Sequence, residues 1–254
     1  MAAIIPTSLR PARTPSGEAA LADARRALFH ANQFNEAARA ASTGDGGVLR
    51  VGFVGSATHY ILPRIVTAFR SRHPGVQLVL REATSVRIMQ GLEDDTLDVG
   101  VVRVPVSSHA GTRLLPLQTE PFILAVPSAH PLAKVNPVRL QDLSEEGFIL
   151  YTQSDAAGLR MASIHACQLR GFTPRLAQEA VQVQTVLSLV EAGLGIALVP
   201  SINRRLNSEK ITYKALADFP ESASIGISLT WRPDVETPAL RNFLQVASKL
   251  FDLQ

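Results

Sequence analysis

A strand, a short loop and a helix follow one another between Leu49 and Phe69, and this unit constrains the fold more than any other stretch. Arg50–Val54 is rich in β-branched and aromatic residues, which is typical of a parallel strand covered on both faces. After Gly55, apolar residues recur at helical spacing. The unit therefore predicts an open α/β sheet, in which ligands usually bind at the carboxyl ends of the strands.

Ser56 lies in the loop of this unit, where the chain leaves the strand and approaches the helix. Free backbone N–H groups at a helix start favour an anion, so Ser56 is a candidate ligand contact. Serine is also among the preferred helix caps, and on this fragment alone a capping role is the alternative.

The composition limits the class of protein. A chain of 254 residues that is 46% hydrophobic can bury one or two domain cores. No apolar run approaches the roughly 20 residues that cross a bilayer, and the N-terminus lacks the apolar segment of a secretory signal, so we expect a cytoplasmic protein. Cys167 is the single cysteine, which excludes an internal disulfide. The net charge of +3 is too small to indicate nucleic-acid binding by bulk charge.

The first 47 residues differ from the rest. Residues 1–15 contain three prolines and little periodicity, and we expect them to be extended or disordered. An alanine-rich helix is predicted from Ser16, and Thr43–Gly47 (TGDGG) ends it with a flexible joint. Its narrow heptad-like seam comprises Leu21, Ala24, Leu28, Ala31, Asn35 and Ala38. Such a helix needs a partner, so we predict a dimerising or connecting segment; the alternative is a surface helix packed on the following domain.

From Val48 onward, strand and helix signals alternate. Strands over 76–82 and 97–103, with a helix over 86–92 between them, complete a βαβαβ half. A second series has strands over 147–151, 176–181 and 195–200 and helices over 159–169 and 183–193; the strand over 225–231 leads into a terminal helix. Two α/β halves joined by extended segments predict two lobes, with a cleft between them that binds a small molecule.

Four motifs carry a family resemblance: LRVGFVGSATHYILPRIVTAFRSRHPGVQLVLRE, the LDVGVVR element that ends at Arg103, EPFILAVPSAHPLA, and VQTVLSLVEAGLGIALVP. Together they resemble the effector-binding part of LysR-type transcriptional regulators, which has the two-lobed architecture of type 2 periplasmic binding proteins. The resemblance implies a lobe I of 48–121 plus 228–254 and a lobe II of 122–227, with the effector between them. It also implies that 16–47 is a linker helix with a hinge.

The resemblance has one gap. Family members carry a winged helix-turn-helix of roughly sixty residues before the linker, and the about fifteen residues here are too few for such a domain. Residues 1–15 would then be a remnant of it. We therefore expect a truncated regulator that does not bind DNA specifically by itself, and that assembles as a homodimer or homotetramer.

Polar residues at strand ends and helix starts supply the candidate effector contacts. Ser56, Ser85 and Arg103 match ligand contacts of the family, particularly in members that sense muconate and related intermediates of aromatic degradation. The full set of candidates is Ser56, Thr84, Ser85, Arg103, Tyr151, Gln153, Ser154, Gln184 and Thr185. A small carboxylate would accept charge-assisted hydrogen bonds from Arg103, although Arg103 could instead belong to a structural ion pair. No metal or cofactor is predicted.

Three rival functions remain at this stage. An enzyme is not expected, because the chain lacks a G-x-S-x-G elbow, a phosphate-binding glycine-rich loop and histidines paired at metal-ligand spacing. A solute-binding protein for transport would share the fold but would need an export signal. A partner that oligomerises with an intact regulator through the 16–41 helix, without binding DNA itself, is the third.

Overall fold

The computed structural model describes residues 20–21, 23–29, 46–106, 111–205 and 208–251. Residues 20–21 and 23–29 are helical, within the helix predicted from Ser16. The remainder of that prediction, and the one made for 1–15, lie outside the described residues. No helix in the described part of the chain is long and apolar enough to cross a membrane.

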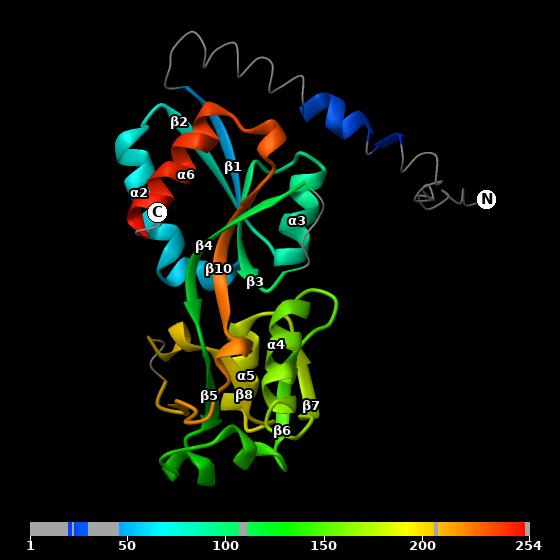
Figure 1. The fold of residues 1–254 in the computed structure, drawn as a ribbon, viewed down its shortest axis with the longest axis vertical. Coiled ribbons are helices and arrows are strands. Elements are labelled where there is room, and N and C mark those ends of the chain that lie inside the picture. The colour runs from blue at the N-terminus through cyan, green and yellow to red at the C-terminus, as the bar shows by residue number, and fades with distance from the viewer. Residues whose placement is uncertain (1–19, 22, 30–45, 107–110, 206–207, 252–254) are drawn as a thin grey trace, which may run out of the picture.

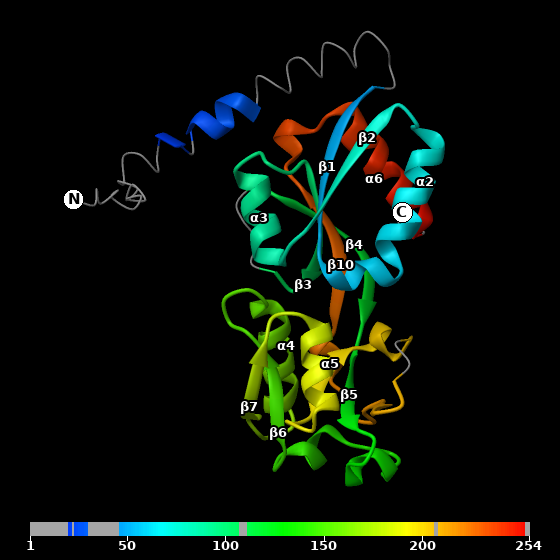
Figure 2. The same ribbon diagram turned by 180° about the vertical axis from the view of Figure 1, so that it is seen from behind.

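Lobe I is built on a five-stranded sheet with the strand order β2-β1-β3-β10-β4. Its strands are β1 (Gly47–Phe53), β2 (Val76–Glu82), β3 (Val99–Val104), β4 (Arg113–Glu120) and β10 (Ile225–Trp231). The first three are parallel, as the βαβαβ pattern predicts, while β10 runs antiparallel to β3 and β4. Helices α2 (Ile61–Arg72) and α6 (Pro238–Leu250) cover one face, and α3 (Ser85–Glu93) covers the other (Figures 1 and 2). The short helices of this lobe are η1 (Gly55–His59) and η6 (Pro233–Val235).

Lobe II contains two small sheets. The antiparallel one has the order β8-β5-β9 and comprises β5 (Phe122–Pro127), β8 (Ala197–Pro200) and β9 (Ile211–Lys214). The parallel one pairs β6 (Gly147–Tyr151) with β7 (Arg175–Ala180), and a bridge between Phe148 and Ile196 joins β6 to the segment before β8. The helices are α4 (Ala157–Gln168), α5 (Val183–Glu191), η2 (Pro131–Lys134), η3 (Leu140–Leu143), η4 (Ser201–Arg205) and η5 (Glu221–Ala223).

Two separate hydrophobic clusters form the cores of the lobes. The chain passes between the lobes twice. At the first crossing, Leu117 belongs to the cluster of lobe I and Phe122 to the cluster of lobe II. At the second crossing, Ile225 belongs to the cluster of lobe II and Ile227 to the cluster of lobe I. Both crossings are extended backbone, β4 into β5 and β10 (Figure 1). The boundary expected at 227/228 therefore falls inside β10.

The structure confirms the α/β class with two lobes, and it adds strands that the sequence reading omitted. β4 contains Pro116, and proline in an apolar run argues against a strand because it cannot donate to the ladder. β4 lies at the edge of the sheet, where proline is tolerated. β9 is only four residues long and has no clear alternation.

Candidate functional site

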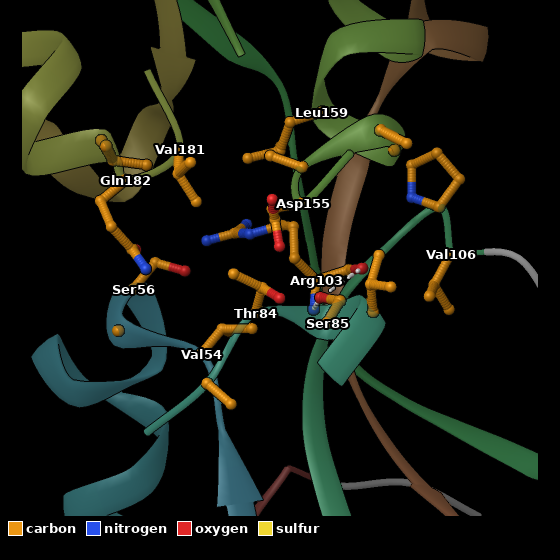
Figure 3. Close-up of a pocket in the computed structure, with 18 of the residues that line it drawn as sticks. Val54, Ser56, Thr84, Ser85, Arg103, Val106, Asp155, Leu159, Val181 and Gln182 are labelled. Carbon is orange, nitrogen blue, oxygen red and sulfur yellow. Dashed lines mark hydrogen bonds between the residues drawn. The ribbon is translucent and has the colours of Figure 1, made fainter. Parts of the chain in front are cut away.

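A cavity of about 390 Å³ lies between the lobes, and both lobes line it. Lobe I contributes the ends of β1, β2 and β3, and lobe II contributes the starts of α4 and α5 (Figure 3). The polar side chains in the lining are those of Ser56, Thr84, Ser85, Arg103, Asp155 and Gln182. The site is thus at the carboxyl edge of the parallel strands, where open α/β sheets usually bind ligands.

Four helices begin at this cavity. The lining includes the first residues of η1, α3, α4 and α5, and all of these except α3 begin without a side-chain cap. The first N–H groups of a helix have no partner within the helix and carry a partial positive charge. Their convergence makes the cavity favourable for an anion.

Arg103 lies near the end of β3 and is only 4% exposed, although it reaches the cavity lining. Its Nη1 donates to Oε1 of Glu120 at 2.6 Å. Its Nε and Nη2 are buried and have no hydrogen-bond partner among the described residues. Arg103 therefore belongs to a structural ion pair, and two of its nitrogen atoms have no acceptor among the described residues. A buried donor without a partner is costly, so an acceptor that reaches it is bound favourably.

Glu120 connects this cation to the second lobe. It ends β4, at the first chain crossing, and its Oε2 accepts hydrogen bonds from the Ser201 hydroxyl at 2.9 Å and from the Ile202 N–H at 2.7 Å. Both donors belong to η4 in lobe II. The ion pair of the cavity is therefore anchored across the hinge.

The three hydroxyls predicted in lobe I all line the cavity, but their hydrogen bonds differ. Ser85 Oγ accepts from the backbone N–H of Arg103 at 3.0 Å, which ties the start of α3 to β3. Thr84 caps α3 by accepting from Arg87 N at 3.4 Å. Ser56 lies within η1, whose cap is Val54, and its hydroxyl makes no hydrogen bond to the described residues. Ser56 is therefore not the helix cap that the alternative interpretation proposed.

Tyr151 lies behind the cavity and is not part of its lining. It is 1% exposed in the core of lobe II, and its hydroxyl has no hydrogen-bond partner among the described residues. Burial raises the pKa of Tyr151 well above its usual value, while the nearby charge of Arg103 acts in the opposite direction. Tyr151 is thus a buried residue of lobe II that lies close enough to Arg103 and Glu120 to feel both charges.

The other predicted contacts of lobe II lie in the expected loops but outside the lining. Gln153 and Ser154 are exposed, and Gln184 and Thr185 are exposed on the first turn of α5. Their neighbours Asp155 and Gln182 line the cavity instead.

Gln182 reaches from lobe II toward lobe I. It is the residue before α5, and its Oε1 lies 3.6 Å from the position that a β-carbon would occupy on Gly55. Figure 3 shows its side chain beside Ser56. A polar residue between a strand and a helix is the signal that identified the other candidates, so the sequence did contain a pointer to Gln182.

Apolar side chains complete the cavity wall. Leu159, Val181 and Val183 contribute from lobe II, and Met89 and Val106 from lobe I. Such a surface favours hydrocarbon or an aromatic ring next to the polar groups. No cluster of metal-ligating side chains occurs among the residues that the structure describes.

The family model described as LysR substrate binding domain matches residues 42–252. The HTH-type transcriptional regulator AlsR of Bacillus subtilis (strain 168) is 33% identical over 235 residues, which are 92% of this chain and 77% of AlsR. The structure of the BenM effector-binding domain with its effector benzoate superposes with a TM-score of 0.70 at 28% identity, covering 81% of this chain and 92% of that one. The structure of full-length CbnR complexed with its target DNA superposes with a TM-score of 0.75 at 26% identity. The match covers 93% of this chain and 82% of the CbnR chain.

The matched family model spans both lobes and the cavity between them, and these solved structures share the same arrangement. The fold is that of type 2 periplasmic binding proteins, and the similar proteins are regulators of transcription. This chain belongs to the LysR-type transcriptional regulators, and residues 42–252 are its effector-binding domain.

Proposed function

We propose that this domain senses a small organic carboxylate in the cavity between its lobes, and that binding changes the regulation of transcription. The observation that carries the proposal is the pair of buried, unpartnered donors on Arg103 in the cavity lining. A carboxylate accepts such donors in a charge-assisted manner, which is stronger than a neutral hydrogen bond.

The surroundings of Arg103 support the same ligand class. The four helix starts favour negative charge, and the Ser56 hydroxyl is available to donate to it. The apolar wall suits a hydrocarbon or aromatic body, in keeping with the benzoate bound by the BenM effector domain. An intermediate of aromatic degradation fits this description.

Binding would act through the relative position of the lobes. A ligand that contacts both lobes favours their closed arrangement, because only a difference in affinity between two states shifts their populations. In a protein that carries a DNA-binding domain before the linker helix, as in the CbnR complex with DNA, this closure would be transmitted through the linker. We propose a homodimer or homotetramer as the functional assembly.

Isothermal titration with benzoate, hexanoate and the neutral analogue benzamide tests the ligand class. We expect both acids to bind and benzamide to bind at least about tenfold more weakly, since a hydrogen bond to a charged group contributes about 1.5–3 kcal/mol. Arg103→Gln should abolish the preference for the acids. Arg72→Gln, on the exposed end of α2, is the matched control and should retain it.

Ser56→Ala provides a second test that leaves the buried ion pair intact. We expect it to weaken binding of the acids several-fold without changing the melting temperature of the free protein. If benzamide binds as tightly as benzoate in the parent and in Ser56→Ala, the cavity does not recognise a carboxylate.

A further inference from the structure

Asp155 places a negative charge in the same cavity that Arg103 lines. It lies in the loop between β6 and α4, is partly buried, and belongs to the lining contributed by lobe II. Figure 3 shows its carboxylate projecting into the space between the lobes, as the Arg103 side chain does from the other side. An anion site that also contains a carboxylate is unusual, since like charges repel strongly away from bulk water.

The fold itself does not explain Asp155. An acidic residue before a helix often accepts from the first N–H groups, but α4 has Ala156 as its cap and no side-chain cap bond. The Asp155 carboxylate accepts one hydrogen bond, from the Ser154 hydroxyl at 2.6 Å, and forms no ion pair with any residue that the structure describes. An ionised carboxylate can accept about four hydrogen bonds, so most of the accepting capacity of Asp155 is left over among the described residues.

We infer that the effector carries a hydrogen-bond donor, a hydroxyl or an ammonium group, in addition to its carboxylate. This inference rests on the proposed function. The carboxylate is held by Arg103 in lobe I and the donor is accepted by Asp155 in lobe II. A ligand of this kind complements both charges of the cavity, and because Arg103 and Asp155 belong to different lobes it bridges them.

Asp155 also acts against other ligands. A plain monocarboxylate brings a negative charge and apolar surface next to Asp155 and offers it no hydrogen-bond donor, which weakens its binding. A dicarboxylate brings a second anion toward Asp155, and juxtaposed like charges disfavour the complex further. The cavity thus selects hydroxy acids and amino acids over diacids of the same length.

Two matched ligand series test the inference by isothermal titration. The first is benzoate, 4-hydroxybenzoate, 4-(aminomethyl)benzoate and terephthalate, and the second is hexanoate, 6-hydroxyhexanoate, 6-aminohexanoate and adipate. In at least one series we expect the acid with a donor to bind about tenfold or more tightly than the plain acid, and the diacid to bind most weakly. Asp155→Asn should reduce both differences, whereas Glu221→Gln, the same change of charge on an exposed turn of lobe II, should reduce neither.

The outcomes separate this inference from the proposed function. If plain acids bind through Arg103 and a donor adds nothing, or if the diacid binds as tightly as the hydroxy acid, the role assigned to Asp155 is wrong while the carboxylate site stands. If Asp155→Asn changes the affinity for the plain acid and for the acid with a donor by the same factor, Asp155 acts only on Arg103 and not on the ligand. If no acid of either series binds, or binding is unchanged in Arg103→Gln, both proposals fail.

Discussion

The guanidinium of Arg103 and the carboxylate of Glu120 form a buried ion pair of 2.6 Å, in which each side chain is 4% exposed. Moving two charges out of water is expensive, and the attraction between them offsets this cost only when further hydrogen bonds satisfy the remaining groups. On the Glu120 side, Ser201 and Ile202 supply those bonds. On the Arg103 side, Nε and Nη2 have no hydrogen-bond partner among the described residues. The ion pair is therefore satisfied around Glu120 and leaves two buried guanidinium nitrogens unsatisfied.

Glu120→Gln should destabilise the protein in the absence of any ligand. The change removes the negative charge while Arg103 stays buried, and breaking a buried pair in this way costs about 3–5 kcal/mol. Urea unfolding followed by circular dichroism measures the loss, with Glu221→Gln as the control for an exposed carboxylate. A loss below about 1 kcal/mol would mean that Arg103 finds another partner or water, and that Glu120 is not its main anchor.

Gly158→Ala should hold the lobes apart. A β-carbon at position 158 would lie 1.7 Å from the carbonyl oxygen of Pro105, so the start of α4 touches the end of β3 at a distance that only glycine permits. The obstacle is backbone, which cannot rotate away as a flexible side chain would. We expect a larger radius of gyration in small-angle X-ray scattering and acid binding at least about tenfold weaker, since part of the binding energy is spent on closure.

The control variant for Gly158→Ala is Gln168→Ala, at the other end of α4 and away from lobe I. It should change neither the radius of gyration nor ligand binding. Equal behaviour of Gly158→Ala and the control would show that α4 moves aside locally, and that contact between Gly158 and Pro105 does not set the distance between the lobes.

Stability should fall at alkaline pH, and Cys167 should account for part of the fall. The thiol is fully buried, and burial raises its pKa to about 12 from an ordinary value of 9.0. Below pH 9 both native and unfolded states keep the proton. Above pH 9 the unfolded state loses it first, so stability decreases by up to about 1.4 kcal/mol per pH unit as the pH rises toward the native pKa.

Urea unfolding of the parent and of Cys167→Ala at pH 8 and pH 10 measures this contribution. Cys167→Ala should be slightly less stable at pH 8, because it leaves a small cavity, but it should lose less stability between the two pH values. The native thiol should also react slowly with thiol reagents at pH 8. Identical pH dependence in both proteins would show that the thiol titrates alike in the native and unfolded states.

Much of the fold could be predicted because its strands are long apolar runs. The strands over 147–151 and 225–231 were predicted at the residues where β6 and β10 occur, since both segments are buried along almost their whole length. β4 escaped detection because Pro116 interrupts it, and only the sheet order shows that this proline lies on an edge. An edge position alone does not hide a strand, because β2 is also an edge strand and was predicted at its observed bounds.

The candidate site shows the same limit at the level of single side chains. In lobe I the strand-end rule indicated Ser56, Thr84, Ser85 and Arg103, and the structure places all of them in the lining, because three parallel strands end at one edge. In lobe II the same rule indicated the correct loops. There the lining residues are Asp155 and Gln182, one or two positions away from Ser154 and Gln184.

The difference has a geometric cause. Each step along a helix turns the side chain by about 100°, so a shift of two residues at the start of α5 separates a side chain in the cavity from one in solvent. The direction in which a loop residue points depends on its backbone dihedral angles, which the residue types around Asp155 do not specify. For Arg103 the sequence posed a ligand contact and a structural ion pair as alternatives. The structure shows the ion pair with Glu120, and the ligand contact stays a prediction that the ion pair does not preclude, because a guanidinium has five N–H donors.

The helical residues 23–29 carry an apolar side chain that the described part of the chain does not cover. Leu28 is 67% exposed, while the neighbouring Phe29 lies under the guanidinium of Arg50 at 5.1 Å and so holds this helix near lobe I.

Leu28 belongs to the predicted heptad seam and Ala27 does not. We therefore expect Leu28→Glu to shift the sedimentation coefficient of the protein toward that of a monomer, and Ala27→Glu, which adds the same charge one residue away, to leave it unchanged. Both variants add one negative charge to the same helix, and only Leu28→Glu changes the seam, so an equal effect would assign the dissociation to charge rather than to the seam. No effect of either would place self-association elsewhere on the protein and favour the surface-helix alternative.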